Sequence, residues 1–437
     1  MTTSSLQRGH ASDSEAVRLP IPPTVLLVLF VPGHLFDWSV EWAWLGLQLL
    51  MAALWFSMPQ NRMASTAGIG PLTWVSCFVL FSLCGFVGSM YGGTILGLEA
   101  SAADLSDLLR FLISIPLVLF VGSAIREAAS DAVARALKLM VLFNLVCSAI
   151  VLLPVPVASN LVMLVYEGAK VQYEFGQIRI GIPFANPNFA ALVFLLSFSY
   201  FAFFSKSPLF AALCLVSLFI TGSRSGFIAT LPLLMLAYVR VMNWGLSRPS
   251  ALLVLVVLHA IPLYYLARVA AALEGFGRVM ELIQAVQVLD ISQVETAAIR
   301  FATVENALQF IRESPFFGIG PGRAYGLDVT DAQLVAWPLM YGIPCAILIG
   351  GLFSSMFLSI AWRTRKRGYS LAAIATLMSF FLMLATGDFM KNYRLFFISV
   401  LIVHCMGLIA TRPTSIALKS DAKPGEALGM QGAACAE

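Results

Sequence analysis

Long apolar runs follow one another along nearly the whole chain, with short polar segments between them. A helix needs about 20 apolar residues to cross the hydrocarbon core of a bilayer, and most runs approach or exceed that length. The pattern therefore predicts about 12 transmembrane helices. The predicted spans are 20–38, 42–58, 71–90, 108–125, 137–158, 187–205, 207–222, 225–243, 249–272, 333–361, 369–387 and 393–411.

Two segments between spans are much longer than the others, about 159–186 and 273–332. In the second, apolar residues recur at helical spacing, which predicts two amphipathic helices lying on the membrane surface or capping the bundle. Ser314-Pro315 should end the second of these helices, and Pro187 should begin the span that follows the first long loop. The apolar faces consist of Val279, Leu282, Ile283, Val286 and Leu289, and of Phe301, Val304, Leu308 and Ile311.

Composition leads to the same fold class. Hydrophobic residues make up 59% of the 437 residues and charged residues only 11%, against about 25% charged in a soluble domain. We predict an all-α polytopic membrane protein with a polar tail at 1–19, a transmembrane domain at 20–411 and a disordered tail at 412–437. No small-residue cleavage site follows the first apolar run, so we interpret 1–19 as a tail and not a cleaved signal.

Charge fixes the expected orientation. With the N-terminus inside the cell, 16 of the 27 Lys and Arg lie on the cytoplasmic side, including the cluster Arg363, Arg365, Lys366 and Arg367. Cytoplasmic loops carry an excess of Lys and Arg, so this orientation is favoured. An even number of spans then places both termini in the cytoplasm.

The chain offers no recognisable cofactor site. Six of its seven cysteines lie in apolar runs and show neither a disulfide framework nor metal-ligand spacing. The glycines of Gly318-Ile-Gly320-Pro-Gly322 resemble a phosphate-binding loop, but no Lys and Ser or Thr follow as such a loop requires. We interpret them as a tight turn that returns the chain to the span at 333–361, and expect no nucleotide, metal or nucleic acid.

Three arginines lie on the predicted outer side, although Lys and Arg are otherwise more frequent on the cytoplasmic side. Arg179 lies in the first long loop, Arg224 in the short hairpin Thr221–Gly226, and Arg300 beside the apolar face of the second amphipathic helix. Guanidinium groups bind phosphate oxygens in pairs, and small residues around Arg224 leave backbone N–H groups to join it. Together the three would bind a diphosphate. The alternative is that each contacts lipid headgroups.

The last outer turn carries Asp388, Lys391 and Arg394. These residues either extend the surface formed by the three arginines or form an ordinary salt-bridged turn.

Over about residues 175–350, the motifs resemble the O-antigen ligase and Wzy-type polymerase superfamily of bacterial envelope glycan assembly. The family pattern has Arg-x-Gly-x-x-x-Asn-Pro-Asn entering a span, seen here from Arg179 through Asn186 to Asn188. It continues with a Thr-x-Ser-Arg hairpin, here Thr221–Gly226 with Ser223 and Arg224. An arginine on the large-loop helix and a Pro-x-x-Gly-x-Gly turn follow, here Arg300 and 315–320.

The resemblance implies a GT-C-like glycosyltransferase in the bacterial inner membrane, independent of metal and facing the periplasm. It would transfer glycan from undecaprenyl diphosphate to an acceptor hydroxyl. Arg179, Arg224 and Arg300 would hold the diphosphate and stabilise the charge that develops on it. Expected partners are the lipid-linked donor, a saccharide or lipid-linked acceptor, membrane lipids, a flippase and a chain-length regulator.

One departure from the family concerns the base. Ligases of the family have a histidine shortly after the glycine-rich turn, whereas the histidines here are at 10, 34, 259 and 404. We take Asp331 as the candidate base, Asp328 as second choice, and Arg323, Ser223, Asn186 and Asn188 as supporting residues. Alternatively, Thr330-Asp331 only caps a helix. The missing histidine favours a polymerase of O-antigen, capsule or exopolysaccharide repeats over a ligase that joins O-antigen to lipid A-core.

A transporter of a lipid-linked sugar or small solute is the alternative from another class. Ion-coupled carriers usually hold charged residues near the membrane midplane. Predicted spans 2 to 12 contain essentially none, with His259 and His404 as their ionisable side chains. A non-catalytic scaffold is a third interpretation, and it would tolerate replacement of all three arginines.

Overall fold

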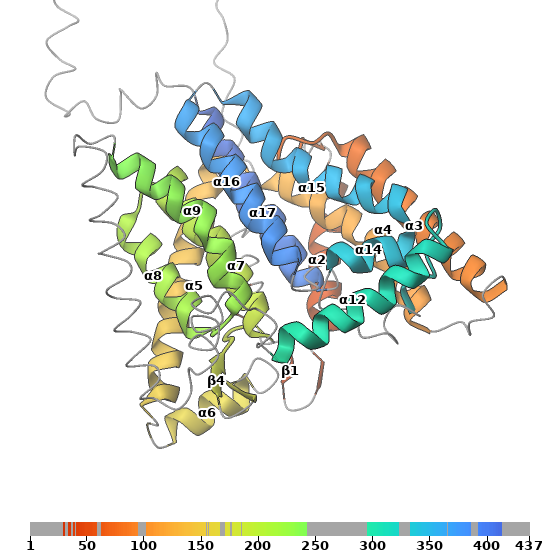
Figure 1. The fold of residues 1–437 in the computed structure, drawn as a ribbon. Coiled ribbons are helices and arrows are strands. Elements are labelled where there is room, and N and C mark those ends of the chain that lie inside the picture. Colours follow the sequence, from red (N-terminus) through yellow and green to blue (C-terminus); the bar gives the residue numbers. More distant parts are fainter. Residues whose placement is uncertain are drawn as a thin grey trace, which may run out of the picture.

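Helices that run between the same two ends make up most of the structure, a computed structural model (Figure 1). The first part of the bundle comprises α2 (Glu41–Ser57), α3 (Pro71–Thr94), α4 (Ala102–Ala124), α5 (Glu127–Leu152), the short α6 (Ala158–Val165), α7 (Pro187–Ser199), its π-helical continuation η2 (Tyr200–Phe204), α8 (Pro208–Ile220) and α9 (Arg224–Met242). The second part comprises α12 (Glu295–Glu313), α14 (Gln333–Tyr341), α15 (Ile343–Arg363), α16 (Arg367–Leu384) and α17 (Tyr393–Thr411).

The structure describes residues 29–30, 34–35, 38–39, 41–58, 63–94, 102–153, 155, 157–166, 171–174, 177–184, 186–242, 295–322, 333–364, 366–385 and 392–412. The tails at 1–19 and 413–437, the predicted span at 249–272 and the first amphipathic helix lie outside these residues.

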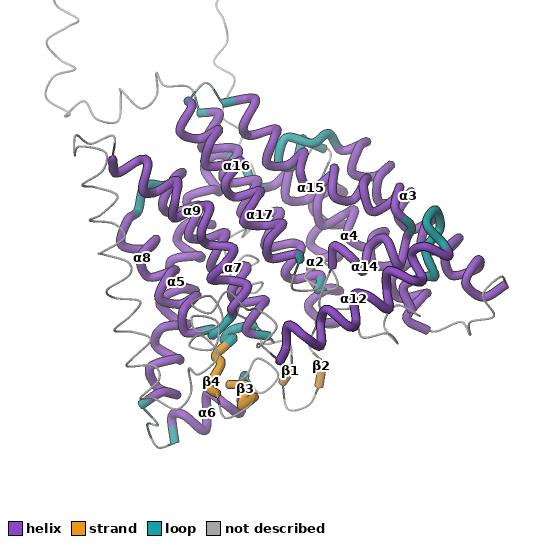
Figure 2. The backbone as a smooth tube through the Cα atoms, in the orientation of Figure 1, coloured by secondary structure: helices purple, strands orange, loops and turns teal. Residues whose placement is uncertain are grey.

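Two small antiparallel sheets interrupt the helical pattern. β1 (His34–Leu35) pairs with β2 (Trp38–Ser39), and β3 (Val171–Glu174) pairs with β4 (Gln177–Ile180), with Arg179 opposite Gln172. Figure 2 shows both at the same end of the bundle as α6. The protein is thus mostly helical, as predicted, but the first long loop contains a helix and a hairpin that the sequence pattern did not reveal.

Six helices are long and apolar enough to cross a membrane: α3, α5, α7 with η2, α15, α16 and α17. Shorter apolar helices occur at four further predicted spans, in α2, α4, α8 and α9. The remaining two predicted spans, 20–38 and 249–272, fall wholly or largely outside the described residues. The structure therefore supports a multi-pass membrane protein with at least six candidate spans, and the full count of 12 stays a prediction.

Two predicted spans are wrong in detail. The span at 20–38 cannot be helical to its end, because β1 and β2 occupy 34–35 and 38–39; Pro32 and Gly33 just before them disfavour a continuous helix. The span at 333–361 is two helices, because Gly342 between them has φ +82°. Pro344 follows and lacks the N–H that a continuous helix would use.

The centre of the bundle is α7 with α17. Buried residues make up 83% of the candidate span in α7 and η2, and 78% of that in α17, against 33% in α3. Pro187 begins α7, as the sequence predicted, and the structure adds that Asn186 caps it. The burial of α7 comes from the helices that pack around it, since a helix that is apolar on all sides can lie either in a protein core or against lipid. Those neighbours are α8, α9, α16 and α17.

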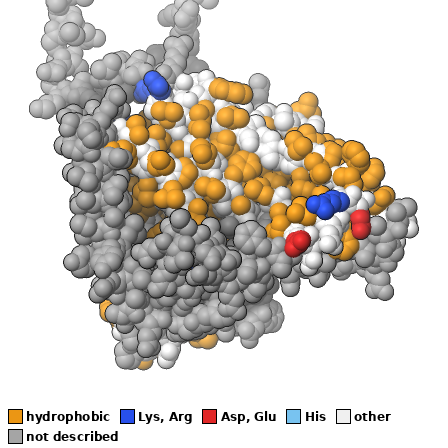
Figure 3. Space-filling view, viewed as in Figure 1, with side chains coloured by type: hydrophobic (Ala, Val, Ile, Leu, Met, Phe, Trp, Pro, Cys, Tyr) orange, Lys and Arg blue, Asp and Glu red, His pale blue; other side chains and the backbone are white. Residues whose placement is uncertain are grey.

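The outer surface is strongly apolar. On α3, Leu72, Leu83, Phe86 and Met90 are exposed, and Figure 3 shows hydrophobic side chains covering the stretch between charged groups at the upper edge and over α12. Apolar patches of this extent do not face water in a soluble monomer. This surface fits contact with lipid.

The two ends of the bundle differ in charge. The end called here the basic end contains the α4–α5, η2–α8 and α15–α16 connections and the C-terminus of α17. Arg412 Nη2 donates to Ser130 Oγ at 3.1 Å, which joins the end of α17 to the α4–α5 connection. Thr364 Oγ1 donates to the Ala410 carbonyl at 3.2 Å, which joins it to the α15–α16 connection. Basic residues at this end are Arg126, Lys206, Arg363, Lys366, Arg367 and Arg412. The opposite end contains β3, β4, α6, α12 and the α8–α9 turn (Figure 1).

Candidate functional site

The start of α7 and the loop before it form the base of the candidate site. Asn186 Oδ1 accepts a hydrogen bond from the Asn188 N–H at 2.8 Å, which caps the helix. The loop from Gly181 folds back against this helix start so closely that a Cβ on Gly181 would lie 2.9 Å from Pro187 N. Only glycine fits this approach, which fixes the position of Asn188 relative to β4.

Arg179 of β4 is brought to Asn188. Its guanidinium is buried, with the residue 7% exposed, and Nη2 donates to Asn188 Oδ1 at 2.9 Å. Ser223 Oγ donates to the same oxygen, also at 2.9 Å. One amide oxygen therefore joins the strand that carries Arg179 to the α8–α9 turn.

The α8–α9 turn has a conformation that places Arg224 next to this cluster. Gly222 has φ +59°, and a Cβ on it would lie 3.3 Å from Arg179 Cγ, so the turn packs on the stem of that arginine. Ser223 Oγ also accepts from the Gly226 N–H at 3.2 Å. This bond caps α9, of which Arg224 is the first residue.

We call Arg179, Asn188, Ser223 and Arg224 the arginine cluster. Two helices, α7 and α9, begin at it, and a helix N-terminus carries a partial positive charge with N–H groups not used within the helix. Arg224 is partly exposed, whereas Arg179 is buried. Two guanidinium groups and two helix N-termini together favour an anion with several oxygens.

Arg394 does not belong to the arginine cluster but contacts the loop that leads to it. It lies at the start of α17, 7% exposed, and its Nη2 and Nη1 donate to the carbonyls of Leu29 at 2.9 Å and Pro183 at 3.3 Å. Its guanidinium also lies 4.9 Å from the ring centre of Phe184. Arg394 thus holds the 181–186 loop, while its sequence neighbours Asp388 and Lys391 lie outside the described residues.

Sequence reasoning missed Asn144 of α5. This fully buried side chain donates through Nδ2 to the Ile182 carbonyl, so the 181–186 loop is held from a second side. The sequence does contain a hint of this role, because Asn144 is the one amide in an otherwise apolar run. A buried amide needs a hydrogen-bond partner, so its presence there predicts a contact.

The large loop crosses the same end of the bundle. Its helix α12 carries Arg300 and ends at Glu313, directly before Ser314-Pro315, as predicted. Ala307 and Ile311 face inward and are buried, and α12 packs on α14. The side chain of Arg300 lies outside the described residues, as do Arg323, Asp328 and Asp331.

The glycine-rich turn after α12 is a structural turn. The N–H groups of Ile319 and Gly320 donate to the Leu339 and Met340 carbonyls at 2.7 and 3.2 Å, and the Ile343 N–H donates to Pro315 at 2.8 Å. These N–H groups are already used, so the phosphate-loop interpretation is wrong. The turn instead fits into the break between α14 and α15.

Asp104, at the start of α4, holds the end of this turn. Its Oδ1 accepts from Ser89 Oγ at 2.7 Å and from the Gly322 N–H at 2.8 Å. Gly322 immediately precedes the stretch with the candidate base, so Asp104 fixes where that stretch begins. The sequence gave no motif for this role, because Asp104 is some 200 residues away in the chain.

Among the described residues, no group of three His, Cys, Asp or Glu side chains is arranged to hold a metal ion. The site consists of guanidinium, amide and hydroxyl groups, which bind anions and sugar hydroxyls.

Comparison with known proteins gives one finding. Residues 209–341 match the O-antigen ligase family, over less than a third of the chain. The matched segment includes the hairpin with Arg224, helix α12 with Arg300 and the turn at 315–320, whereas Arg179 precedes it. No curated protein matches the chain. The family match confirms the resemblance to the O-antigen ligase and Wzy-type polymerase superfamily, and indicates an activity of the ligase or polymerase type.

Proposed function

Because residues 209–341 match the O-antigen ligase family, we propose that this protein transfers glycan from undecaprenyl diphosphate to a saccharide acceptor. The observation that carries the proposal is the arginine cluster, in which Asn188 Oδ1 accepts from both Arg179 and Ser223 at the point where α7 and α9 begin. The helix carrying Arg300 crosses the same end (Figure 1). No described feature of this cluster supplies a nucleotide site.

In the proposed reaction, the acceptor hydroxyl oxygen attacks the anomeric carbon of the donor sugar. The bond from that carbon to the diphosphate oxygen breaks, and undecaprenyl diphosphate leaves with the electron pair. Arg179, Arg224 and Arg300 stabilise the growing negative charge, which is greater in the transition state than in the bound donor. Asp331 receives the proton of the acceptor hydroxyl, with Asp328 as the second candidate.

The charged residues at the two ends of the bundle support the proposed orientation. Basic residues mark the cytoplasmic side of a membrane protein, and Arg363, Lys366 and Arg367 lie at the basic end. This charge distribution supports an orientation in which the arginine cluster faces the periplasm of a bacterial inner membrane. In the proposed orientation both tails are cytoplasmic, and the end of α17 at the basic end supports this for the C-terminus.

Between the two members of the superfamily, we favour the polymerase. The ligases have a histidine after the glycine-rich turn, and this chain has none in the loop 273–332. A polymerase would extend lipid-linked repeat units of O-antigen, capsule or exopolysaccharide, together with a flippase and a chain-length regulator.

The test is a transfer assay with the purified full-length protein and an undecaprenyl-diphosphate-linked repeat unit, with and without lipid A-core. Arg224→Ala and Arg300→Ala should reduce the rate by at least about 100-fold, as expected when charge stabilisation of a leaving group is lost. Arg312→Ala is the matched control, because Arg312 is exposed on the same helix as Arg300.

Longer lipid-linked chains without lipid A-core would support the polymerase. Product only with lipid A-core would establish a ligase. Absence of transfer with either acceptor, or full activity of both arginine variants, would contradict the proposal and favour the transporter.

A further inference from the structure

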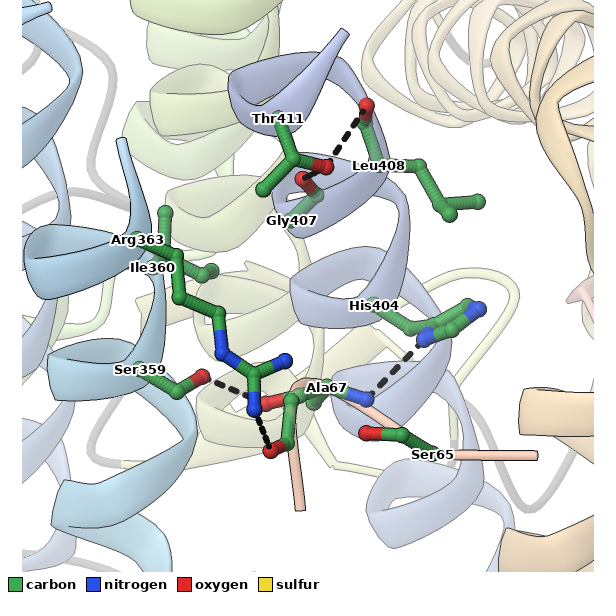
Figure 4. Close-up of a pocket in the computed structure, with 10 residues that line it drawn as sticks. Ser65, Ala67, Ser359, Ile360, Arg363, His404, Gly407, Leu408 and Thr411 are labelled. Carbon is green, nitrogen blue, oxygen red and sulfur yellow. Dashed lines mark hydrogen bonds between the residues drawn. The ribbon is translucent and has the colours of Figure 1, made fainter. Parts of the chain in front are cut away.

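A cavity lies at the basic end, between α15, α17 and the segment 63–70 (Figure 4). Its volume is ≈ 130 Å³, and its polar lining consists of Ser65, Gly68, Ser359, Arg363, His404 and Thr411. Since a water molecule occupies about 30 Å³, the cavity has room for several waters or for one tetrahedral oxyanion. It is at the other end of the bundle from the arginine cluster.

The wall of the cavity is built by hydrogen bonds to the backbone of the segment 63–70. The Ala67 N–H donates to His404 Nδ1 at 2.9 Å, and Ser359 Oγ donates to the Ala67 carbonyl at 2.7 Å. Arg363 Nη2 donates to the Gly68 carbonyl at 2.9 Å. Figure 4 shows the side chains of His404, Ser359 and Arg363 pointing toward the backbone at Ala67. These three bonds therefore fix the shape of the cavity wall.

The lining favours an anion. His404 is neutral in this arrangement, because Nδ1 accepts from Ala67 while Nε2 donates to the Ile125 carbonyl at 2.9 Å. Arg363 therefore supplies the charge, and the lining residues include no Asp or Glu. A guanidinium has five N–H groups, so Arg363 keeps donors for a ligand after binding Gly68. The Ser65 hydroxyl adds a donor at the exposed rim, whereas the Thr411 hydroxyl already donates to the Gly407 carbonyl at 2.9 Å.

The cavity lies at the ends of two candidate membrane spans. Arg363 and Thr411 are the last residues of α15 and α17. Trp362, beside Arg363, is 81% exposed, and tryptophan is enriched where the hydrocarbon core meets the headgroups. A lipid phosphate is therefore the anion that this cavity meets at the highest local concentration.

We propose that this cavity binds a phosphate group, contributed by the headgroup of an anionic phospholipid. Bound there, the phosphate pairs with Arg363 and joins the ends of α15 and α17 to the segment 63–70. This site is independent of the proposed transfer reaction, so either proposal can fail without the other.

The experiment uses the full-length protein, delipidated in a neutral detergent, and titrates dioctanoyl phosphatidylglycerol while recording the unfolding temperature and lipid adducts by native mass spectrometry. Dioctanoylglycerol, which lacks phosphate, and inorganic phosphate are the comparison ligands. We expect phosphatidylglycerol to bind and raise the unfolding temperature, and Arg363→Ala to weaken binding about tenfold or more. Arg367→Ala removes an exposed positive charge that does not line the cavity, and should bind normally.

Arg363→Ala also removes the hydrogen bond to Gly68, so a loss of lipid binding in this variant could come from misfolding. A second variant that leaves this bond intact separates the two causes. Ser65→Glu places a negative charge at the exposed rim, where Ser65 makes no hydrogen bond among the described residues, and should abolish binding. Equal binding by inorganic phosphate would establish the phosphate site but overturn the lipid as its source. Equal loss in the Arg363 and Arg367 variants, unchanged binding by Ser65→Glu, or no adduct with the wild type would overturn the proposal.

Discussion

At the scale of single residues, Asn188 connects the parts of the arginine cluster. Its Oδ1 accepts from Arg179 and Ser223, which come from two different connections of the chain. Asn188 therefore orients the buried arginine, and its own side chain carries no charge that would oppose an anion.

Asn188→Asp separates this structural role from anion binding. Aspartate keeps the accepting oxygen, so the unfolding temperature should be retained. The new negative charge should raise KM for the diphosphate donor by about tenfold to 100-fold, through repulsion at partial burial. Transfer kinetics and thermal unfolding measure the two effects. Wild-type KM in this variant would mean that the cluster does not contact the diphosphate.

At Asp104, two substitutions separate the role of the accepting oxygen from that of the negative charge. Asp104→Ala removes the acceptor for Ser89 and Gly322 and should lower the free energy of unfolding by about 2–4 kcal/mol. Asp104→Asn retains an oxygen that can accept both bonds, so it should cost less than about 1 kcal/mol. Denaturant unfolding in detergent measures both. Equal losses would show that the charge of Asp104, and not its accepting oxygen, holds the turn.

At the scale of elements, the break between α14 and α15 determines how the large loop meets the bundle. Gly342 has φ +82°, and a Cβ there would clash with the Phe316 carbonyl. The break exposes the carbonyls of Leu339 and Met340, which accept from the turn after α12. An unbroken helix would use those carbonyls itself.

Gly342→Ala should therefore destabilise the protein by about 2 kcal/mol or more, from backbone strain and the clash. Gly351→Ala is the matched control, because Gly351 lies within α15 and a Cβ there meets nothing within 4 Å. That change should stabilise the helix by about 0.5–1 kcal/mol. Thermal unfolding measures the stability of both variants. Equal changes in stability would contradict the role assigned to Gly342.

Sequence periodicity predicted α12, its end at Glu313 and the start of α7 at Pro187 correctly. It predicted one span over 333–361 because hydropathy counts apolar residues and does not register the backbone angle of Gly342. It also missed β3 and β4, because two four-residue strands leave too short an alternating pattern.

At the scale of the whole molecule, the two ends carry different chemistry. The basic end contains Arg363, Lys366 and Arg367 and the cavity beside Arg363. The opposite end contains the arginine cluster, α6 and α12. This asymmetry supports the proposed orientation, with the arginine cluster on one side of the membrane and the basic end on the other.

Fusion proteins test this orientation. A fluorescent protein fused after Arg412 should fluoresce in cells, whereas alkaline phosphatase at the same point should be inactive, because it needs the periplasm for its disulfides. Alkaline phosphatase fused after Ala385, at the other end of α16, should be active. The opposite result at either point would reverse the orientation and place the arginine cluster in the cytoplasm.

The sequence by itself determined the membrane class, most span positions and the three candidate arginines. Each of these depends on local composition or on a charge in an unusual place, which can be counted along the chain. The tertiary structure decided that Arg179 meets Ser223 through Asn188, that Arg394 and Asn144 hold the loop beneath them, and that Asp104 fixes the turn after α12. These contacts join residues that are far apart in the chain, and the sequence pattern of each element contains no information about which other element it will face.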